Sequence, residues 1–264
     1  MRVISWNVNS IRSRQSRLLS LLRHHEPDIA LLQETKCDDE LFASSEFTGA
    51  YETLGYDVAH HGRDHWNGVA ILSRVGIEQV RRGFPGVNQD PFDEPRLISA
   101  QCGGIDVHSV YVPNGRALDD PHYLFKLVWL ERLRSVIDAD RATVVAGDFN
   151  VAPTDLDIYD PSRWRRKTHA SPPERAAIDA LVDLGLEDIT RRHLPGPDVF
   201  TWWNYRPGQF ERNRGLRLDL ALCSPTVADR VEAVWIDTAE RADDHPTEKP
   251  SDHAPLVLDL RPEP

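Results

Sequence analysis

One stretch in the middle of the chain places an acid and an amide directly after an apolar run. Residues 143–148 read Thr-Val-Val-Ala-Gly-Asp, and Phe149 and Asn150 follow. The apolar, β-branched start predicts a strand buried on both faces. Side chains two apart in an extended chain point the same way, so Asp148 and Asn150 should project together from the strand's end. Such a pair suits a metal or a phosphate, although a polar turn after a core strand has the same pattern.

A second acid lies inside an apolar strand, where Asp219 stands between Leu218 and Leu220. A buried carboxylate needs a partner, because burying it alone is costly. His253, which immediately precedes the last predicted strand, is a natural partner. The carboxylate would accept a hydrogen bond from one ring nitrogen and leave the other free for chemistry. We therefore predict an Asp219–His253 pair, whereas His253 alone would be typical of an ordinary strand end.

Further polar residues stand at the ends of other predicted strands. They are Asn7 and Asn9 after the first strand, Glu34 after the second and Tyr111 after a middle one. Each alone fits a turn or a surface position, but together they would form a hydrolytic site if the strand ends converge. The ligand set is rich in oxygen and contains at most one histidine, which suits Mg²⁺ or Mn²⁺ better than zinc. A serine nucleophile is disfavoured because the chain has no G-x-S-x-G motif.

The elements that must carry these residues are mostly strands. We expect strands at 2–8, 29–32, 56–60, 68–73, 77–82, 97–101, 105–112, 143–148, 200–203, 216–223, 231–236 and 255–260. Helices are expected after an N-cap at Ser10, from Asp120 with Pro121 at its first position, and from a capping box at Ser171 and Glu174. Residues 37–54 read as irregular or weakly helical.

The order of these elements favours an α/β sandwich of two mainly antiparallel sheets packed face to face, with helices on both outer faces. The sequence has no repeat of fixed period and no Gly/Ser linker. We therefore expect one domain over residues 1–264. No apolar run approaches the roughly 18 residues of a membrane helix, and no signal-peptide pattern is present. The three isolated cysteines are typical of a reducing cytoplasm.

The charge pattern is uneven. Hydrophobic residues make up 40% of the chain and charged residues 28%, as in soluble globular proteins. A net charge of −11 by itself argues against a polyanionic partner. Basic residues nevertheless gather in two loop-like stretches, 163–167 and 206–217. Basic clusters are usually solvated surface, but these two could form one surface that follows a phosphate backbone.

These motifs belong to a larger ordered set. Almost end to end, the chain resembles the exonuclease III family of class II abasic-site endonucleases, within the endonuclease/exonuclease/phosphatase superfamily. The segments that carry the resemblance are 5–9, 32–36, 67–72, 81–86, 111–114, 147–155, 201–206, 214–219 and 249–255. The resemblance implies a four-layered α/β sandwich with a cleft at one edge of the two sheets, and a monomer that acts on double-stranded DNA.

The resemblance also implies a role for each strand-end residue. Glu34 would bind the metal, with Asn7 and Asp252 nearby as direct or indirect ligands. Asp148 would activate water, Asn150 would orient it, His253 held by Asp219 would contact the phosphate, Tyr111 would steady negative charge and Asn114 would touch a phosphate oxygen. Asn9 stands where some members carry aspartate, which leaves the site one charge lighter and disfavours a second metal.

The implied substrate site lies in the loops. Trp202, Leu216 and Leu218 match the positions that line the abasic-sugar pocket, although Leu218 also fits ordinary core packing. Arg96, Asn213 and Arg214 are the implied contacts to DNA. The resulting hypothesis is a Mg²⁺- or Mn²⁺-dependent nuclease that cuts 5′ to abasic sites and trims 3′ ends of duplex DNA. The alternatives are a phosphoesterase for a small or lipid phosphate and a catalytically inactive scaffold that binds damaged DNA.

Overall fold

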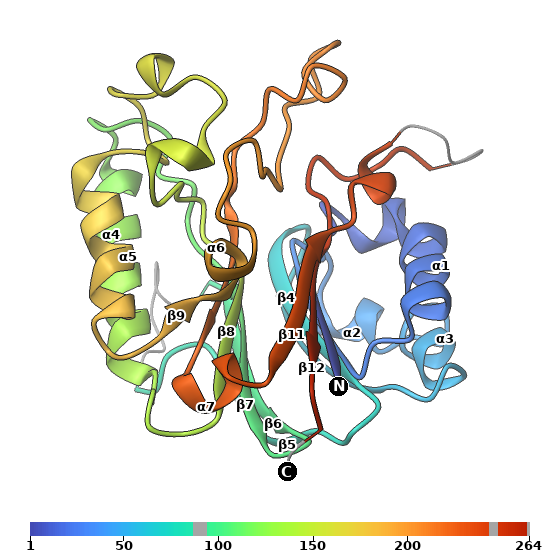
Figure 1. Cartoon of the computed structure of the whole chain (residues 1–264). Helices are drawn as coiled ribbons and strands as arrows, with labels where there is room; N and C mark the ends of the chain where they lie inside the picture. The colour runs from blue at the N-terminus through green and yellow to red at the C-terminus, as the bar shows by residue number, and fades with distance from the viewer. Residues whose placement is uncertain (87–93, 243–247, 263–264) are drawn as a thin grey trace.

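Two six-stranded sheets stack face to face between layers of helices (Figure 1). The computed structural model describes residues 1–86, 94–242 and 248–262. In spatial order, the first sheet comprises β11 (Val231–Ile236), β12 (Leu256–Leu260), β1 (Arg2–Asn7), β2 (Ile29–Gln33), β4 (Trp66–Ser73) and β3 (Asp57–Arg63). The second comprises β5 (Glu78–Arg82), β6 (Leu97–Cys102), β7 (Ile105–Tyr111), β8 (Thr143–Asp148), β10 (Asp219–Cys223) and β9 (Glu187–Asp188). The predicted sandwich is confirmed.

Helices cover the outer faces of both sheets (Figure 1). On the first sheet lie α1 (Gln15–His25), α2 (Asp39–Phe42) and α3 (Thr48–Glu52), and on the second lie α4 (Pro121–Val136) and α5 (Pro172–Val182). The shorter segments are α6 (Ile189–His193), α7 (Pro225–Ala228) and the 3-10 turns η1 (Ile11–Ser13), η2 (Asp155–Asp157), η3 (Pro161–Arg163) and η4 (Thr238–Arg241). Among the described residues, no helix has both the length and the apolar character needed to cross a membrane.

The central strands are buried on both faces. In β8, Val144 and Ala146 pack into the core between the sheets, whereas Val145 faces the core under α4 and α5. In β1, Val3 faces the other sheet and Ile4 faces the helices. Because side chains alternate along a strand, each of these strands contributes apolar side chains to the core between the sheets and to the core under its own helices. Some polar residues are buried within these strands, such as Ser5 in β1, but the predicted site residues Asn7 and Asp148 lie at the strand ends.

Strand direction brings those ends to one edge. Most neighbouring strands are antiparallel, but β1 and β2 run parallel, as do β7 and β8. Tyr111 on β7 pairs in register with Asp148 on β8, and Asp148 pairs in turn with Asp219 at the start of antiparallel β10. Parallel strands end, and antiparallel strands begin, at the same edge of a sheet. The register therefore sets three of the predicted site residues side by side.

Several predicted boundaries are correct and others are wrong. Asp120 caps α4 by accepting a hydrogen bond from the His122 N–H at 2.8 Å, and the capping box of Ser171 and Glu174 opens α5. Ser10 does not cap a helix, because its φ of 91° places it in a left-handed turn before η1, and its side chain makes no capping hydrogen bond. The α-helix begins only at Gln15.

The predicted strand at 200–203 is also wrong. Trp202 forms only isolated bridges, to Leu216 and to His253, so the segment crosses between two chain segments instead of extending a sheet. For the same reason the regular strand predicted from 216 begins only at Asp219. The pattern of bulky residues was typical of a strand, but main-chain pairing on each side lasts for a single residue.

Candidate active site

Asp148 ends β8 and is buried, with 1% of its surface exposed. Its Oδ1 accepts the main-chain N–H of Asn150 at 2.8 Å, and its Oδ2 lies 3.2 Å from Asn150 Nδ2. Asn150 has a left-handed φ of 51°, which turns its amide back toward the acid. A Cβ at Gly147 would lie 2.0 Å from the carbonyl oxygen of Val110, so the close approach of β7 and β8 here requires glycine. The predicted pairing of Asp148 with Asn150 is confirmed.

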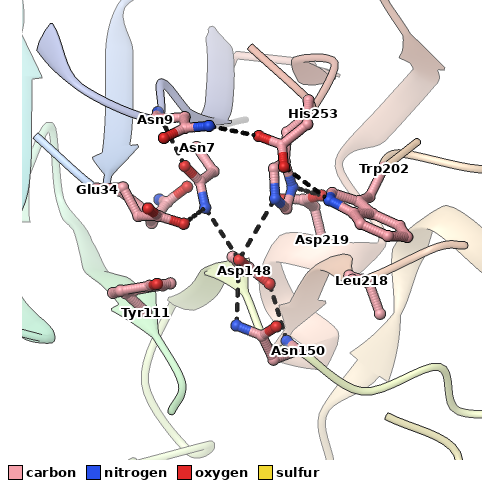
Figure 2. A network of polar contacts seen from close by, with 12 residues as sticks. Asn7, Asn9, Glu34, Tyr111, Asp148, Asn150, Trp202, Leu218, Asp219 and His253 are labelled. Atoms are coloured by element: carbon pink, nitrogen blue, oxygen red, sulfur yellow. Dashed lines mark hydrogen bonds and ion pairs between the residues drawn. The ribbon is translucent and has the colours of Figure 1, made fainter. Parts of the chain in front are cut away.

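The predicted Asp219–His253 pair is confirmed as well. Asp219 Oδ2 lies 2.8 Å from His253 Nδ1, and both side chains are buried. His253 Nε2 lies 3.6 Å from Asp148 Oδ2 (Figure 2). Burial opposes protonation of the ring, but the carboxylates of Asp219 and Asp148 outweigh it and raise the pKa of His253 to about 10. At neutral pH the ring is therefore a cation that donates from Nδ1 and presents Nε2–H at the site.

The surroundings of Asp148 favour its neutral form, whereas those of His253 favour the charged form. Burial raises the pKa of its carboxyl to about 7; His253 opposes this rise, and the negative charges of Asp219 and Glu34 add to it. A carboxyl with a pKa near neutrality can accept a proton from water and release it again. The Asp148 carboxyl therefore has the proton affinity that a general base needs near neutral pH.

Asn7 joins the two acids on the other side. Its Nδ2 donates to Glu34 Oε1 at 2.8 Å and to Asp148 Oδ2 at 2.9 Å, while its Oδ1 accepts the main-chain N–H of Asn9 at 3.0 Å. The amide thus offers hydrogens to the acids and turns its oxygen toward the backbone. In this arrangement Asn7 bridges Glu34 and Asp148 and presents no oxygen to a cation between them.

Ligand atoms of Glu34, Asp148 and His253 lie within 4.8 Å of one another, close enough to hold one ion. Two carboxylates suit a hard divalent cation. A protonated His253 has no free lone pair, so the oxygens of Glu34 and Asp148 are the ligands that fit. Glu34 leaves β2 with a left-handed φ of 53°, which aims its carboxylate into the site. Lys36 Nζ lies 2.8 Å from Glu34 Oε2 and balances its charge.

Asp252 lies outside that group of three. Its Oδ1 accepts a hydrogen bond from Asn9 Nδ2 at 2.8 Å, and its Oδ2 accepts one from Trp202 Nε1 at 2.9 Å. Both oxygens are thus engaged by neighbours. The predicted ligand Asp252 links the polar network to the Trp202 loop in this structure.

Tyr111 ends β7 next to Glu34. Burial, together with the nearby charge of Glu34, raises the pKa of the Tyr111 hydroxyl well above its ordinary value, so the hydroxyl stays protonated and can donate. The Arg96 guanidinium carbon lies 4.7 Å from the centre of the Tyr111 ring, and the Arg96 side chain also pairs with Glu94. Arg96 lines a hollow of about 380 Å³ that it shares with Arg116. Arg96 thus lies beside Tyr111, and its contact with DNA stays a prediction.

The two basic stretches meet at one hollow of about 340 Å³. It is lined by Tyr159, Arg163, Trp164, Lys167, Trp202, Asn204, Arg206, Gln209 and Arg214. Leu216 and Leu218 are almost fully buried in a small cluster against which Trp202 packs. Trp202 is therefore the wall that faces the hollow, and the two leucines support it from behind.

Three other residues were predicted to contact phosphate or DNA, and the structure places them differently from one another. Asn114 Nδ2 lies 3.3 Å from Asn150 Oδ1, which places it at the site. Asn213 accepts from Trp203 Nε1 and donates to the Asp198 carbonyl, both at 3.1 Å, so its side chain braces its own loop. Arg217 was expected in the basic surface, but this is wrong. Its guanidinium is fully buried, in ion pairs with Asp157 and Asp188.

The profile of the Endonuclease/Exonuclease/phosphatase family matches residues 4–253. The chain belongs to this family. A relative from Haemophilus influenzae named exodeoxyribonuclease III is 36% identical, over 99% of this chain and 100% of its own length. A 3′ phosphatase from Neisseria, solved with a product DNA hairpin, superposes with a TM-score of 0.92 at 37% identity over 99% of both chains. An AP endonuclease from Archaeoglobus fulgidus gives 0.90 at 36% identity, over 98% of this chain and 99% of that one.

This member of the Endonuclease/Exonuclease/phosphatase family also places residues at its site that the sequence interpretation missed. Thr201 Oγ1 accepts the main-chain N–H of Asp219 at 3.0 Å. Lys126 is fully buried below Asn150. A signal for Lys126 existed, because it lies three residues after Tyr123 and four before Leu130, on the face that α4 buries. A lysine at such a position must find acceptors in the interior.

Proposed function

We propose that this protein is a metal-dependent DNA repair nuclease that cuts phosphodiesters 5′ to abasic sites and removes nucleotides or blocking groups from 3′ ends of duplex DNA. The observation that carries the proposal is the carboxyl of Asp148, with a pKa of about 7, held 3.6 Å from the charged ring of His253. A base and a cationic donor at that spacing suit hydrolysis of a phosphodiester. The exodeoxyribonuclease, phosphatase and AP endonuclease relatives support the same chemistry.

In the proposed mechanism, ionised Asp148 takes a proton from the attacking water. Asn150 and Asn7 hold the carboxylate by N–H donation, so its direction is fixed before the substrate binds. The Nε2–H of His253 and the hydroxyl of Tyr111 donate to the phosphate oxygens as negative charge builds. Donors of this kind are each worth about 3 kcal/mol of transition-state stabilisation.

Glu34 and Asp148 would hold a divalent cation, and we propose Mg²⁺ or Mn²⁺. Such an ion, when bound, neutralises charge on the phosphate and activates it toward attack. The Lys36–Glu34 contact shows how the protein balances this carboxylate with its own cation. A cation held by Glu34 would therefore share this carboxylate with the Lys36 ammonium group.

The substrate is proposed from the hollow beside Trp202. Arg163, Lys167, Arg206 and Arg214 line it and can pair with backbone phosphates, despite the net charge of −11. Trp202 offers an apolar wall to a sugar without a base, and a tight wall would exclude an intact nucleotide by size. The cytoplasmic location, the monomeric state and the single domain inferred from the sequence stay predictions.

The test uses three substrates with the purified protein. One duplex carries a tetrahydrofuran lesion, one carries a 3′-phosphate at a nick, and the third substrate is an inositol phosphate. Each is incubated with Mg²⁺, with Mn²⁺ and with chelator, beside an Asp148→Asn control. Metal-dependent cutting at the lesion and release of the 3′ group support the proposal. Turnover of inositol phosphate alone would favour the small-phosphate phosphoesterase, and DNA binding without turnover would favour the inactive scaffold.

A further inference from the structure

An ion pair without solvent contact lies directly beneath the site. Lys126 on α4 and Glu174 on α5 are both fully buried, and Lys126 Nζ lies 2.5 Å from Glu174 Oε1. Burial opposes ionisation of Glu174, but Lys126 and the hydroxyls of Ser171 and Thr168 outweigh it and lower the pKa of Glu174 to about 2. Burial lowers the pKa of Lys126, and the adjacent charge of Glu174 opposes this. Glu174 is therefore the ionised partner on which the Lys126 nitrogen is held, and none of the proposed chemical steps uses the pair.

The pair ties together three chain segments. Lys126 Nζ donates to the carbonyl of Asn150 at 2.6 Å and lies 3.3 Å from the carbonyl of Asn114. Glu174 Oε1 accepts the N–H of His169 at 2.8 Å and the hydroxyl of Thr168 at 2.7 Å. His169 Nδ1 lies 2.6 Å from the same Asn150 carbonyl. One ammonium and one carboxylate thus anchor the loops that carry Asn114 and Asn150.

Those two residues lead directly to the proposed base. The main-chain N–H of Asn150 donates to Asp148 Oδ1 at 2.8 Å, and the Asn114 amide lies 3.3 Å from the Asn150 side chain. We infer that Lys126, paired with Glu174, is a positioning residue that holds Asn150 and Asn114 in register with Asp148. This inference rests on the proposed function, in which Asp148 accepts the proton.

Stability alone gives little reason for such a pair. Replacing a buried ion pair by neutral residues of similar volume is often neutral or stabilising. What the ammonium adds is a single point that binds two carbonyls of different loops. The space is also closely fitted, because a Cβ at Gly115 would lie 2.6 Å from Thr168 Oγ1 and 3.2 Å from Lys126 Cδ. The pair therefore fixes the positions of the Asn114 and Asn150 loops more than it stabilises the folded protein.

The experiment compares Lys126→Met, the double variant Lys126→Met/Glu174→Gln and Leu133→Ala. The double variant removes both charges, and glutamine preserves the capping box. Leu133 is fully buried on the same helix and its side chain faces the core under α4, so it is the control for a loss of stability without a change at the site. Thermal unfolding, kcat and KM on lesion duplex, and hydrogen exchange of the Asn150 and Ala152 amides are measured for each protein.

We expect both lysine variants to lose on the order of 100-fold in kcat, as misplaced catalytic groups do, with little change in KM. The Asn150 amide should exchange faster in both, and Leu133→Ala should keep kcat at a comparable loss of thermal stability. Wild-type kcat in the double variant, or an equal loss in Leu133→Ala, would overturn the inference. If the wild-type protein does not cut DNA, the proposed function fails. Independently of that result, unchanged hydrogen exchange of the Asn150 amide in the two lysine variants would overturn the positioning role.

Discussion

Asp219 Oδ2 lies 2.8 Å from His253 Nδ1, and the second oxygen, Oδ1, has no hydrogen-bond partner among the described residues. The buried charge of Asp219 is therefore compensated mainly through His253. The converse also holds, because Asp219 is the largest of the charges that keep the ring protonated against the effect of burial. The pair makes His253 a permanent donor at the pH at which Asp148 can act as a base.

Asp219→Asn should neutralise His253 at pH values where the native ring is charged. The pKa of His253, about 10 in the native protein, should fall toward or below 6.5, and kcat should drop by roughly 10²–10³-fold as a phosphate donor is lost. An NMR titration of the ring and kcat near neutral pH test this. The matched control is Asp237→Asn, which removes the carboxylate 2.7 Å from the ring of His25, away from the site. A His253 ring in Asp219→Asn that still titrates as in the native protein would contradict the prediction.

The rate should depend on pH in two limbs. Asp148 must be ionised to take a proton, so kcat/KM should rise with pH through a midpoint at or below about 7, since a bound cation favours the ionised form. The rate should fall again as His253 loses its proton near pH 10. Asp219→Asn should shift the falling limb to lower pH. A profile without a rising limb at acidic pH would remove Asp148 from the role of base.

Asp148→Asn should separate activity from stability. An acid whose pKa rises from 3.8 unfolded to about 7 folded destabilises the native state as pH increases through that interval, because the unfolded chain loses its proton first. The variant escapes this cost and should be more stable than the native protein at pH 8, by at most about 4 kcal/mol. The gain should vanish below the unfolded pKa.

Denaturant unfolding at acidic and alkaline pH measures this gain, beside kcat and affinity for lesion duplex. We expect kcat to fall by about 10³-fold or more with DNA affinity retained. Asp155→Asn, at an exposed acid, is the control for a simple change of charge. Equal loss of binding and cutting in Asp148→Asn would mean that Asp148 chiefly holds the substrate.

Glu34→Gln should weaken binding of the cation. An ion that binds only the folded protein raises its stability by about 2.7 kcal/mol at a concentration 100 times its dissociation constant. The native protein should therefore melt at a higher temperature with Mn²⁺ or Mg²⁺, and Glu34→Gln should need far more metal for the same shift. Thermal unfolding with metal titration shows this without an activity assay. Glu78→Gln, on the exposed face of β5, should behave as the native protein, and an equal shift in Glu34→Gln would exclude Glu34 as a ligand.

The parts of the site that could be predicted follow from local rules. The two-residue repeat of an extended chain predicts that Asp148 and Asn150 lie together, although the contact is made by the left-handed turn at Asn150 after β8 ends. Asp219 pairs with His253 because a lone buried acid must be compensated. The apolar alternation also predicted the sandwich, since strands buried on both faces need covering layers on each side. None of these inferences needed a contact between distant segments to be known beforehand.

The parts that could not be predicted depend on such contacts. Arg217 lies in a stretch that is typical of a basic surface, and the helical spacing of Lys126 indicates burial but does not indicate its partner. Only the approach of Asp157 and Glu174 from other segments gives these two cations their buried ion pairs. The segment 200–203 has strand-like residues, but its pairing partners come from two different loops. Ser10 does not cap a helix because its main chain, with a φ of 91°, pairs with the segment that follows β2.

Trp202 should determine how well an abasic sugar is held. Its Nε1 donates to Asp252 Oδ2 at 2.9 Å, and its ring packs against the cluster of Leu216 and Leu218. Trp202→Ala removes the wall and should raise KM for lesion duplex by roughly 10-fold to 100-fold, the scale of one lost aromatic contact of about 1–3 kcal/mol. Trp202→Phe keeps a ring and should lose much less. The control is Trp235→Ala on β11, where the ring packs beneath Arg2 of β1 in the same sheet. Steady-state kinetics on lesion and intact duplex measure both effects, and a wild-type KM in Trp202→Ala would place the sugar elsewhere.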